Sequence, residues 1–214
     1  MLPIALGGDS SAPLRVLCLG AHSDDIEIGC GGTILRLLQE RPCSVDWVVF
    51  SANAERQAEA RASAADFLTS ASAQNVRVHA FRESYFPYVA AEIKDSFEAF
   101  KRASEPDLVF SHHRHDQHQD HRLIADLTWN TFRNHLILEY EIHKYEGDLG
   151  HPNVYVPLSL TIADRKTELL LRHFPSQAGR TWFRADTFNG LMSVRGVECN
   201  EVRAEAFHAR KLVL

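Results

Sequence analysis

The stretch LRVLCLGAHSDD at residues 14–25 decides the fold class of this chain. Its first eight residues, 14–21, form a mostly apolar run, which is typical of a central β-strand buried on both faces of a parallel sheet. The run then gives way to His22, Asp24 and Asp25, at the point where such a strand ends. Open α/β sheets place their ligands at the carboxyl ends of the strands, so this stretch predicts both a buried strand and a functional site.

Strand-like and helix-like patterns alternate along the chain after this run. The strand-like segments are short and apolar, whereas the helix-like segments place apolar residues on one face. This alternation predicts βαβ units and a Rossmann-like α/β fold, with a mainly parallel sheet and helices on both faces. The expected strands are 14–21, 45–51, 76–81, 108–111 and 136–142, and the expected helices are 29–38, 54–68, 91–103 and 120–132.

The pattern weakens after residue 142. Residues 144–157 contain two prolines, two glycines and an asparagine, so they are predicted to form a long loop. Residues 165–174 and 187–194 are predicted to be helices, and residues 206–214 either a final strand or a docking segment.

Length and composition are those of one ordinary globular domain. With 214 residues, we expect a single domain over residues 1–214, in which 1–13 form a flexible N-terminal segment. The formal net charge of −5 and the lack of a basic run argue against nucleic acid as a partner. No signal peptide or transmembrane segment is recognisable, and the four cysteines show no disulfide framework, which favours a cytoplasmic location. The sequence is compatible with either a monomer or an oligomer.

The first polar cluster combines imidazole and carboxylate groups after the strand at 14–21. His22 and Asp25 are three residues apart, so a turn can aim both side chains at one point, with Asp24 beside them. Such groups are the usual ligands of catalytic zinc, which keeps one position open for water. The alternative is that Asp24 or Asp25 caps a helix starting near Gly29, while His22 is a hydrogen-bonded loop histidine.

The second polar cluster follows the strand at 108–111 and contains five histidines within ten residues. His118 and His121 lie on one face if a helix begins here. Asp120 is either the N-cap of that helix or, as we favour, a carboxylate that hydrogen-bonds a histidine ring and orients it. Asp116 is placed where it can face the mouth of a site. The remaining histidines are interpreted as loop or surface residues: His112, His113 and His115.

Both clusters together resemble the motifs of the PIG-L/LmbE-like family of zinc-dependent de-N-acetylases. The family's AHPDD and glycine-rich GGT elements correspond to AHSDDIEIGCGGT at residues 21–33, with Ser23 in place of the usual proline. The family's HxDH motif corresponds to residues 118–121. Weaker similarity continues through Arg56–Glu59, which is similar to RxxE, and through residues 140–141. The resemblance therefore covers most of residues 14–145.

The resemblance implies a role for each matching residue. It implies that His22, Asp25 and His121 are the zinc ligands and that Asp24 is the general base. His118 would stabilise the oxyanion or protonate the leaving amine. Arg56 would hold a substrate oxygen, although a surface ion pair between Arg56 and Glu59 is an equal alternative.

We further expect residues 140–157 to wall the pocket, because long loops beside a site often carry substrate contacts. Tyr145 is the predicted substrate-binding residue of this segment, and changes at Tyr145 or Asp148 should alter substrate affinity more than metal content.

The expected function is metal-dependent removal of an acetyl group from an N-acetylated amino sugar or a related amine. The expected partner is a small-molecule N-acetylated glycoside. Zn²⁺ is the expected cofactor, although a His₂Asp site also accepts Fe²⁺. The alternatives are a metal-dependent hydrolase of another bond and a non-catalytic binding protein that kept the fold.

Overall fold

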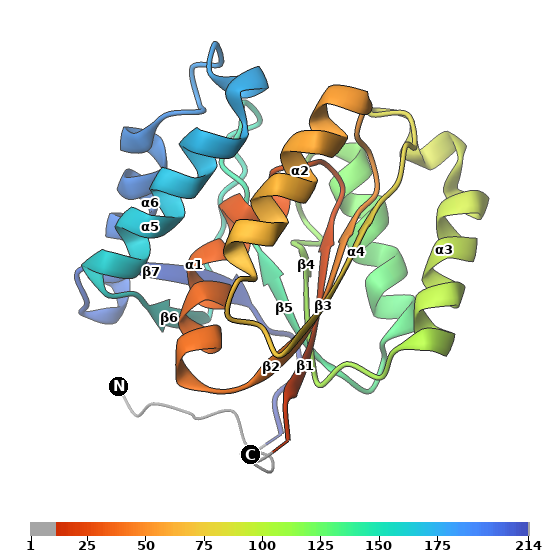
Figure 1. The fold of residues 1–214 in the computed structure, drawn as a ribbon, viewed down its shortest axis with the longest axis horizontal. Helices are drawn as coiled ribbons and strands as arrows, with labels where there is room; N and C mark the ends of the chain where they lie inside the picture. The colour runs from red at the N-terminus through yellow and green to blue at the C-terminus, as the bar shows by residue number, and fades with distance from the viewer. Residues whose placement is uncertain (1–11, 214) are drawn as a thin grey trace.

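The computed structural model describes residues 12–213, which form a seven-stranded sheet covered by helices on both faces (Figure 1). The expected flexible segment at residues 1–13 lies almost entirely outside the described residues. The strands are β1 (Leu14–Gly20), β2 (Cys43–Val49), β3 (Ala73–Val78), β4 (Leu108–His112), β5 (Leu136–Tyr140), β6 (Val154–Pro157) and β7 (Ala204–His208). The α-helices are α1 (Asp25–Glu40), α2 (Ala54–Phe67), α3 (Ala90–Ala103), α4 (Gln119–Thr131), α5 (Leu160–His173) and α6 (Ala185–Cys199).

The sheet confirms the predicted α/β fold with mainly parallel strands. The strand order is β3-β2-β1-β4-β5-β7-β6, and the first five of these are mutually parallel. β7 runs antiparallel to β5, and β6 runs antiparallel to β7. β6 occupies the end of the segment predicted to be a loop, so that prediction is wrong for residues 154–157.

Both faces of β1 are buried, as its apolar run predicts. Val16 and Cys18 point into the larger core, which the sheet shares with α1, α2, α5 and α6. Leu17 and Leu19 point into a second core, which the sheet shares with α3 and α4. In Figure 1 α3 and α4 accordingly lie on one side of the sheet, with α1, α2 and α5 on the other. This alternation follows from the two-residue period of a strand.

The strand order changes direction between β1 and β4. After β1 the chain builds β2 and β3 on one side, and it then crosses back to place β4 and β5 on the other side. The loops that leave β1 and β4 thus start at the carboxyl edge of the sheet where the strand order reverses, which is where ligands bind in open α/β folds. Both polar clusters directly follow these two strands, which are neighbours in the sheet.

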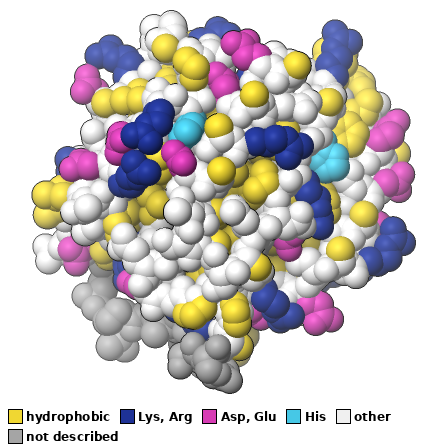
Figure 2. Space-filling model, in the orientation of Figure 1, with side chains coloured by type: hydrophobic (Ala, Val, Ile, Leu, Met, Phe, Trp, Pro, Cys, Tyr) yellow, Lys and Arg dark blue, Asp and Glu magenta, His cyan; other side chains and the backbone are white. Residues whose placement is uncertain are grey.

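A helix that spans a membrane must be long and mostly apolar. Among residues 12–213, no helix is long and apolar enough to cross a bilayer. The face shown in Figure 2 carries acidic and basic side chains interspersed, without a large patch of one sign. All four cysteines are buried and unpaired, which is common for free cysteines in a protein core.

Candidate metal centre and active site

The first polar cluster occupies the turn from β1 into α1. The helix begins at Asp25 rather than near Gly29, so the predicted start is wrong by about one turn. Acidic residues at 25 and 27 lie in the first turn, where the positive end of the helix dipole favours them. Asp24 is the N-cap residue, yet its side chain makes no capping hydrogen bond. Its carboxylate is therefore available to the site.

The three residues predicted as metal ligands meet in space. His22 Nδ1 lies 3.1 Å from His121 Nε2 and 3.4 Å from Asp25 Oδ2. His121 Nε2 lies 3.6 Å from the same Asp25 oxygen. Donor atoms about 2.1 Å from one tetrahedral ion stand roughly 3.4 Å apart, so this triangle has the size of a zinc site. All three residues are buried, and the donor set of two imidazoles and a carboxylate suits a catalytic divalent metal.

Each histidine of this triangle presents its second ring nitrogen to a carboxylate. Asp120 Oδ2 lies 3.2 Å from His22 Nε2, and Asp116 Oδ2 lies 2.9 Å from His121 Nδ1. Such outer carboxylates fix the tautomer and the orientation of metal-binding rings. Asp120 is therefore not the N-cap of α4, which is His118; the favoured alternative, a contact with a histidine ring, is the one observed.

Asp120 also fixes the loop that follows β3. Its two carboxylate oxygens accept hydrogen bonds from the amides of Ser84, at 2.6 Å, and Phe86, at 3.1 Å. Ser84 has a positive φ of 65°, and the Phe86 ring packs beside the His22 ring at a centroid distance of 6.1 Å. The loop before α3 is thus held against the candidate metal centre.

His118 lies at the edge of the cluster, where it is partly exposed. Its Nδ1 accepts the backbone N–H of Asp120 at 3.3 Å, which leaves the proton of a neutral ring on Nε2. Burial, together with the charge of His22, lowers the pKa of His118 and favours this neutral form. The ring stands edge-on to His22 with 4.9 Å between centroids. A hydrogen-bond donor is thus available beside the candidate ligands.

Asp24 lies against Arg56, which projects from the first turn of α2. Asp24 Oδ1 and Arg56 Nη2 form an ion pair at 2.9 Å. The other oxygen, Oδ2, is buried and has no hydrogen-bond partner within residues 12–213. Burial raises the pKa of Asp24, and the charge of Arg56 opposes that rise. Glu59 turns away and accepts from Ser176, so the alternative Arg56–Glu59 surface pair does not form.

Burial and charge affect the pKa values of the two histidines of this triangle differently. Burial lowers the pKa of His22, but Asp25 and Asp120 outweigh it and raise that pKa to about 10. Burial and the neighbouring His112 lower the pKa of His121 to about 3. Burial raises the pKa of Asp25, but the nearby histidines outweigh it, and the net shift is downward. The neighbouring carboxylates thus favour the charged form of His22, whereas burial and His112 favour the neutral form of His121.

His112 was interpreted as a loop or surface residue, and that prediction is wrong. β4 extends to His112, whose ring is fully buried and accepts the backbone N–H of Ala21 at 2.9 Å. Its Nε2 lies 3.2 Å from Asp25 Oδ2, and its ring stacks on His121 with 3.9 Å between centroids. The predicted strand at 108–111 ended one residue too early, and extending it to 112 would have placed His112 in a buried strand. His113 is partly buried, and His115 is exposed as expected.

His121 belongs to two overlapping groups of possible metal donors. In one group it is joined by His22 and His118, and in the other by Asp25 and His112. Within each group the donor atoms lie within 4.8 Å of one another. The structure thus holds a His/Asp cluster that can bind a metal ion, centred on His121.

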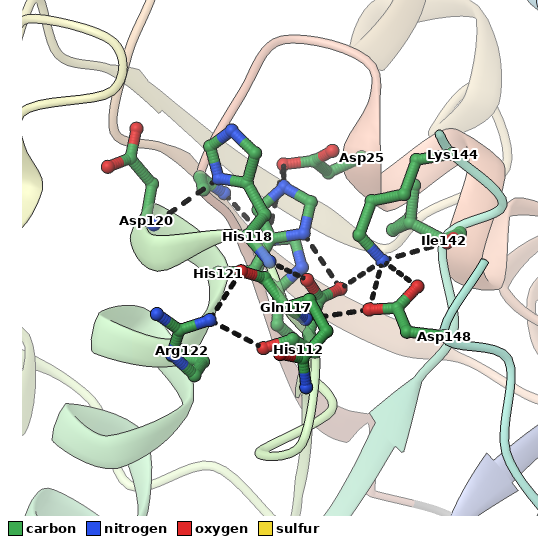
Figure 3. Close-up of polar contacts among 12 residues, drawn as sticks. Asp25, His112, Gln117, His118, Asp120, His121, Arg122, Ile142, Lys144 and Asp148 are labelled. Atoms are coloured by element: carbon green, nitrogen blue, oxygen red, sulfur yellow. Dashed lines mark hydrogen bonds and ion pairs between the residues drawn. The ribbon is translucent and has the colours of Figure 1, made fainter. Parts of the chain in front are cut away.

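The segment after β5 approaches the cluster through residues other than Tyr145. Tyr145 is 72% exposed, unlike the buried residues of the cluster. Lys144 and Asp148 instead reach the loop before α4, as Figure 3 shows. Lys144 was not predicted as a site residue, because the residues around it in sequence give no sign that its side chain contacts Asp116.

Fold and site together define a Rossmann-like α/β protein with a cluster of His and Asp side chains, which could hold a metal ion, at the point where the strand order reverses. The family model described as GlcNAc-PI de-N-acetylase (PIG-L) matches residues 17–132, which is more than half of the chain. The chain therefore belongs to this family, as its motifs predicted, and membership supports an N-deacetylase.

Solved structures share the same fold. A conserved protein from Thermus thermophilus is 20% identical, with a TM-score of 0.75 over 94% of this chain and 96% of its own. N,N'-diacetylchitobiose deacetylase from Pyrococcus horikoshii is 21% identical, with a TM-score of 0.71 over 91% of this chain and 83% of its own. The 4-carboxy-2-hydroxymuconate hydratase GalB from Pseudomonas putida is 17% identical, with a TM-score of 0.72 over 94% of this chain and 98% of its own. The hydratase shows that the fold alone does not decide the reaction.

Proposed function

We propose that the protein is a metal-dependent de-N-acetylase that hydrolyses the acetamide of an amino sugar or a related amine. The observation that carries this proposal is the convergence of His22 Nδ1, Asp25 Oδ2 and His121 Nε2 within 3.1–3.6 Å of one another. These residues would hold the ion. When bound, a divalent metal would act as a Lewis acid and lower the pKa of a water molecule at the site.

Asp24 is the proposed general base. Its Oδ2 is buried without a hydrogen-bond partner among the residues described, while Oδ1 is held by Arg56. One oxygen is thus fixed and the other is free to take a proton from the attacking water. A general base acts only on a proton within hydrogen-bond distance, so the proposal requires the attacking water to lie beside Asp24 Oδ2.

His118 is the proposed donor to the substrate carbonyl. With Nδ1 accepting the Asp120 amide, its Nε2–H can donate to the oxygen that gains negative charge during attack on the amide. The proton that Asp24 takes from the water can then pass to the leaving nitrogen, which departs as the free amine while the acyl group leaves as acetate. Asp120 keeps His22 oriented through its contact with Nε2. Arg56 is proposed to position Asp24 and, at the same edge, a substrate oxygen.

The finer parts of this proposal concern substrate, metal and location. An amino sugar as substrate is supported by the family description and by the diacetylchitobiose deacetylase that shares the fold. Zn²⁺ is the favoured metal because its ligand preference matches two imidazoles and a carboxylate, with Fe²⁺ as the alternative. Tyr145 is proposed to contact the substrate from outside the buried cluster. Four unpaired cysteines agree with a reducing, cytoplasmic location.

The test measures metal content and acetate release on the same purified protein. We expect bound metal, and release of acetate from at least one member of a panel of N-acetylated glycosides, both abolished by a chelator and restored by Zn²⁺. Phosphoester substrates in the same panel test the rival hydrolase. Bound metal with no turnover of any substrate would favour a binding protein, and absence of bound metal would remove the basis of the proposal.

A further inference from the structure

A lysine from the segment after β5 reaches the carboxylate behind His121. Lys144 Nζ lies 3.0 Å from Asp116 Oδ2, and the same Asp116 oxygen lies 2.9 Å from His121 Nδ1. On its other side Lys144 Nζ contacts both oxygens of Asp148, at 2.6 and 2.7 Å, and it also donates to the Ile142 carbonyl at 3.3 Å. The ammonium thus connects two loops beside the candidate metal centre.

These groups are sheltered from solvent. The side chains of Lys144, Asp116 and Asp148 are 11%, 3% and 8% exposed, respectively. A charge pair in such a place is weakly screened, so it acts more strongly than a pair on the open surface. Both carboxylates lie within 3.0 Å of the same nitrogen. Without the ammonium they would face each other at close range with no cation between them.

Asp116 is the member of this group that touches the site. Its Oδ1 accepts the backbone N–H of His118 at 2.8 Å, and its Oδ2 contacts the His121 ring. A displacement of Asp116 would therefore move or rotate one proposed ligand and would loosen the backbone before α4. Asp148 has a separate role, because it accepts the Gln117 N–H at 2.6 Å and so ties the two loops together.

We propose that Lys144 is a positioning residue for the metal ligand His121, acting through Asp116. Its ammonium holds the Asp116 carboxylate on the His121 ring, so that the segment after β5 controls the affinity of the centre for its metal. The inference rests on the proposed metal site, in which His121 is a ligand.

The test compares two variants that break the same ion pair. Lys144→Met and Asp148→Asn each remove the Lys144–Asp148 pair, but only Lys144→Met removes the cation from Asp116. The Zn²⁺ dissociation constant is measured by competition with a chromogenic chelator, and the melting temperature of the metal-free protein is measured for each variant. Lys101→Met, an exposed change on α3, is the matched control. If Lys144→Met does not fold, Lys144→Gln removes the same charge and keeps a polar side chain.

We expect Lys144→Met to weaken zinc binding by about 10–100-fold, the usual effect of losing an outer-shell partner. Asp148→Asn should stay closer to the wild-type affinity, because Lys144 remains on Asp116, although both variants lose stability. Equal weakening in the two variants would mean that Lys144 only anchors the loop, and unchanged zinc affinity in Lys144→Met would also overturn the inference. If the wild-type protein binds no zinc, the metal-site proposal itself fails, which is a distinguishable result.

Discussion

Replacing Asp24 by Asn separates the proposed base from the proposed metal ligands. The two side chains have nearly the same shape, and the Asn oxygen can still face Arg56, which lies 2.9 Å from Asp24 Oδ1. The amide nitrogen of Asn would then replace Oδ2, the buried oxygen that has no hydrogen-bond partner in residues 12–213. Loss of a general base lowers kcat by about 10²–10⁴-fold, which corresponds to roughly 3–5 kcal/mol in the activation barrier.

The assay pairs kcat for acetate release with metal content by elemental analysis. Asp24→Asn should keep the metal, since the triangle of donor atoms comes from His22, Asp25 and His121. Asp164→Asn, an exposed change on α5, controls for the loss of one carboxylate. A kcat within tenfold of wild type, with the metal in place, would show that Asp24 is not the base. An emptied site would show that Asp24 is a ligand.

Three further predictions concern the loop, the core and acid stability. Tyr145→Ala should raise KM or shift substrate preference without changing metal content, as seen in steady-state kinetics beside elemental analysis. Gly29→Ala should destabilise the protein by about 1–3 kcal/mol in denaturant unfolding, because the added Cβ would overlap the ring of fully buried Tyr140. Burial raises the pKa of Glu141, but its hydrogen bonds and the charge of Arg195 outweigh it and lower that pKa. The stability contributed by Glu141 is therefore present above its unfolded pKa of about 4.3 and lost as the pH falls through the folded value. Glu141→Gln should accordingly flatten the acid side of the stability curve, and an unchanged slope would contradict this.

Much of the fold could be predicted from sequence because a strand that is buried on both faces of the sheet appears as a continuous apolar run. The apolar run at 14–21 identified β1, and the alternation of patterns identified the parallel sheet. The short strand β6 was missed because Pro152 and Asn153 precede it and Pro157 ends it, and all three are loop signals. Its pairing partner β7 lies about 50 residues away. The start of α5 was missed by five residues, although Ser159 caps it by accepting the Ile162 N–H at 3.3 Å.

The candidate site was predictable where its residues lie in short local patterns. His22 and Asp25 share one turn, and His118 and His121 share another, so each pair could be recognised in sequence. The buried position of His112 and the Lys144 contact depend instead on how strands and loops meet in three dimensions. Local sequence spacing carries no information on such contacts.

The most direct test of the account is metal stoichiometry in the wild-type protein and in variants of the three proposed ligands. We predict about one divalent ion per chain in the wild type, and loss of metal together with acetate release in His22→Ala, Asp25→Ala and His121→Ala. Full metal occupancy in these variants would contradict the central claim that these three residues form the centre.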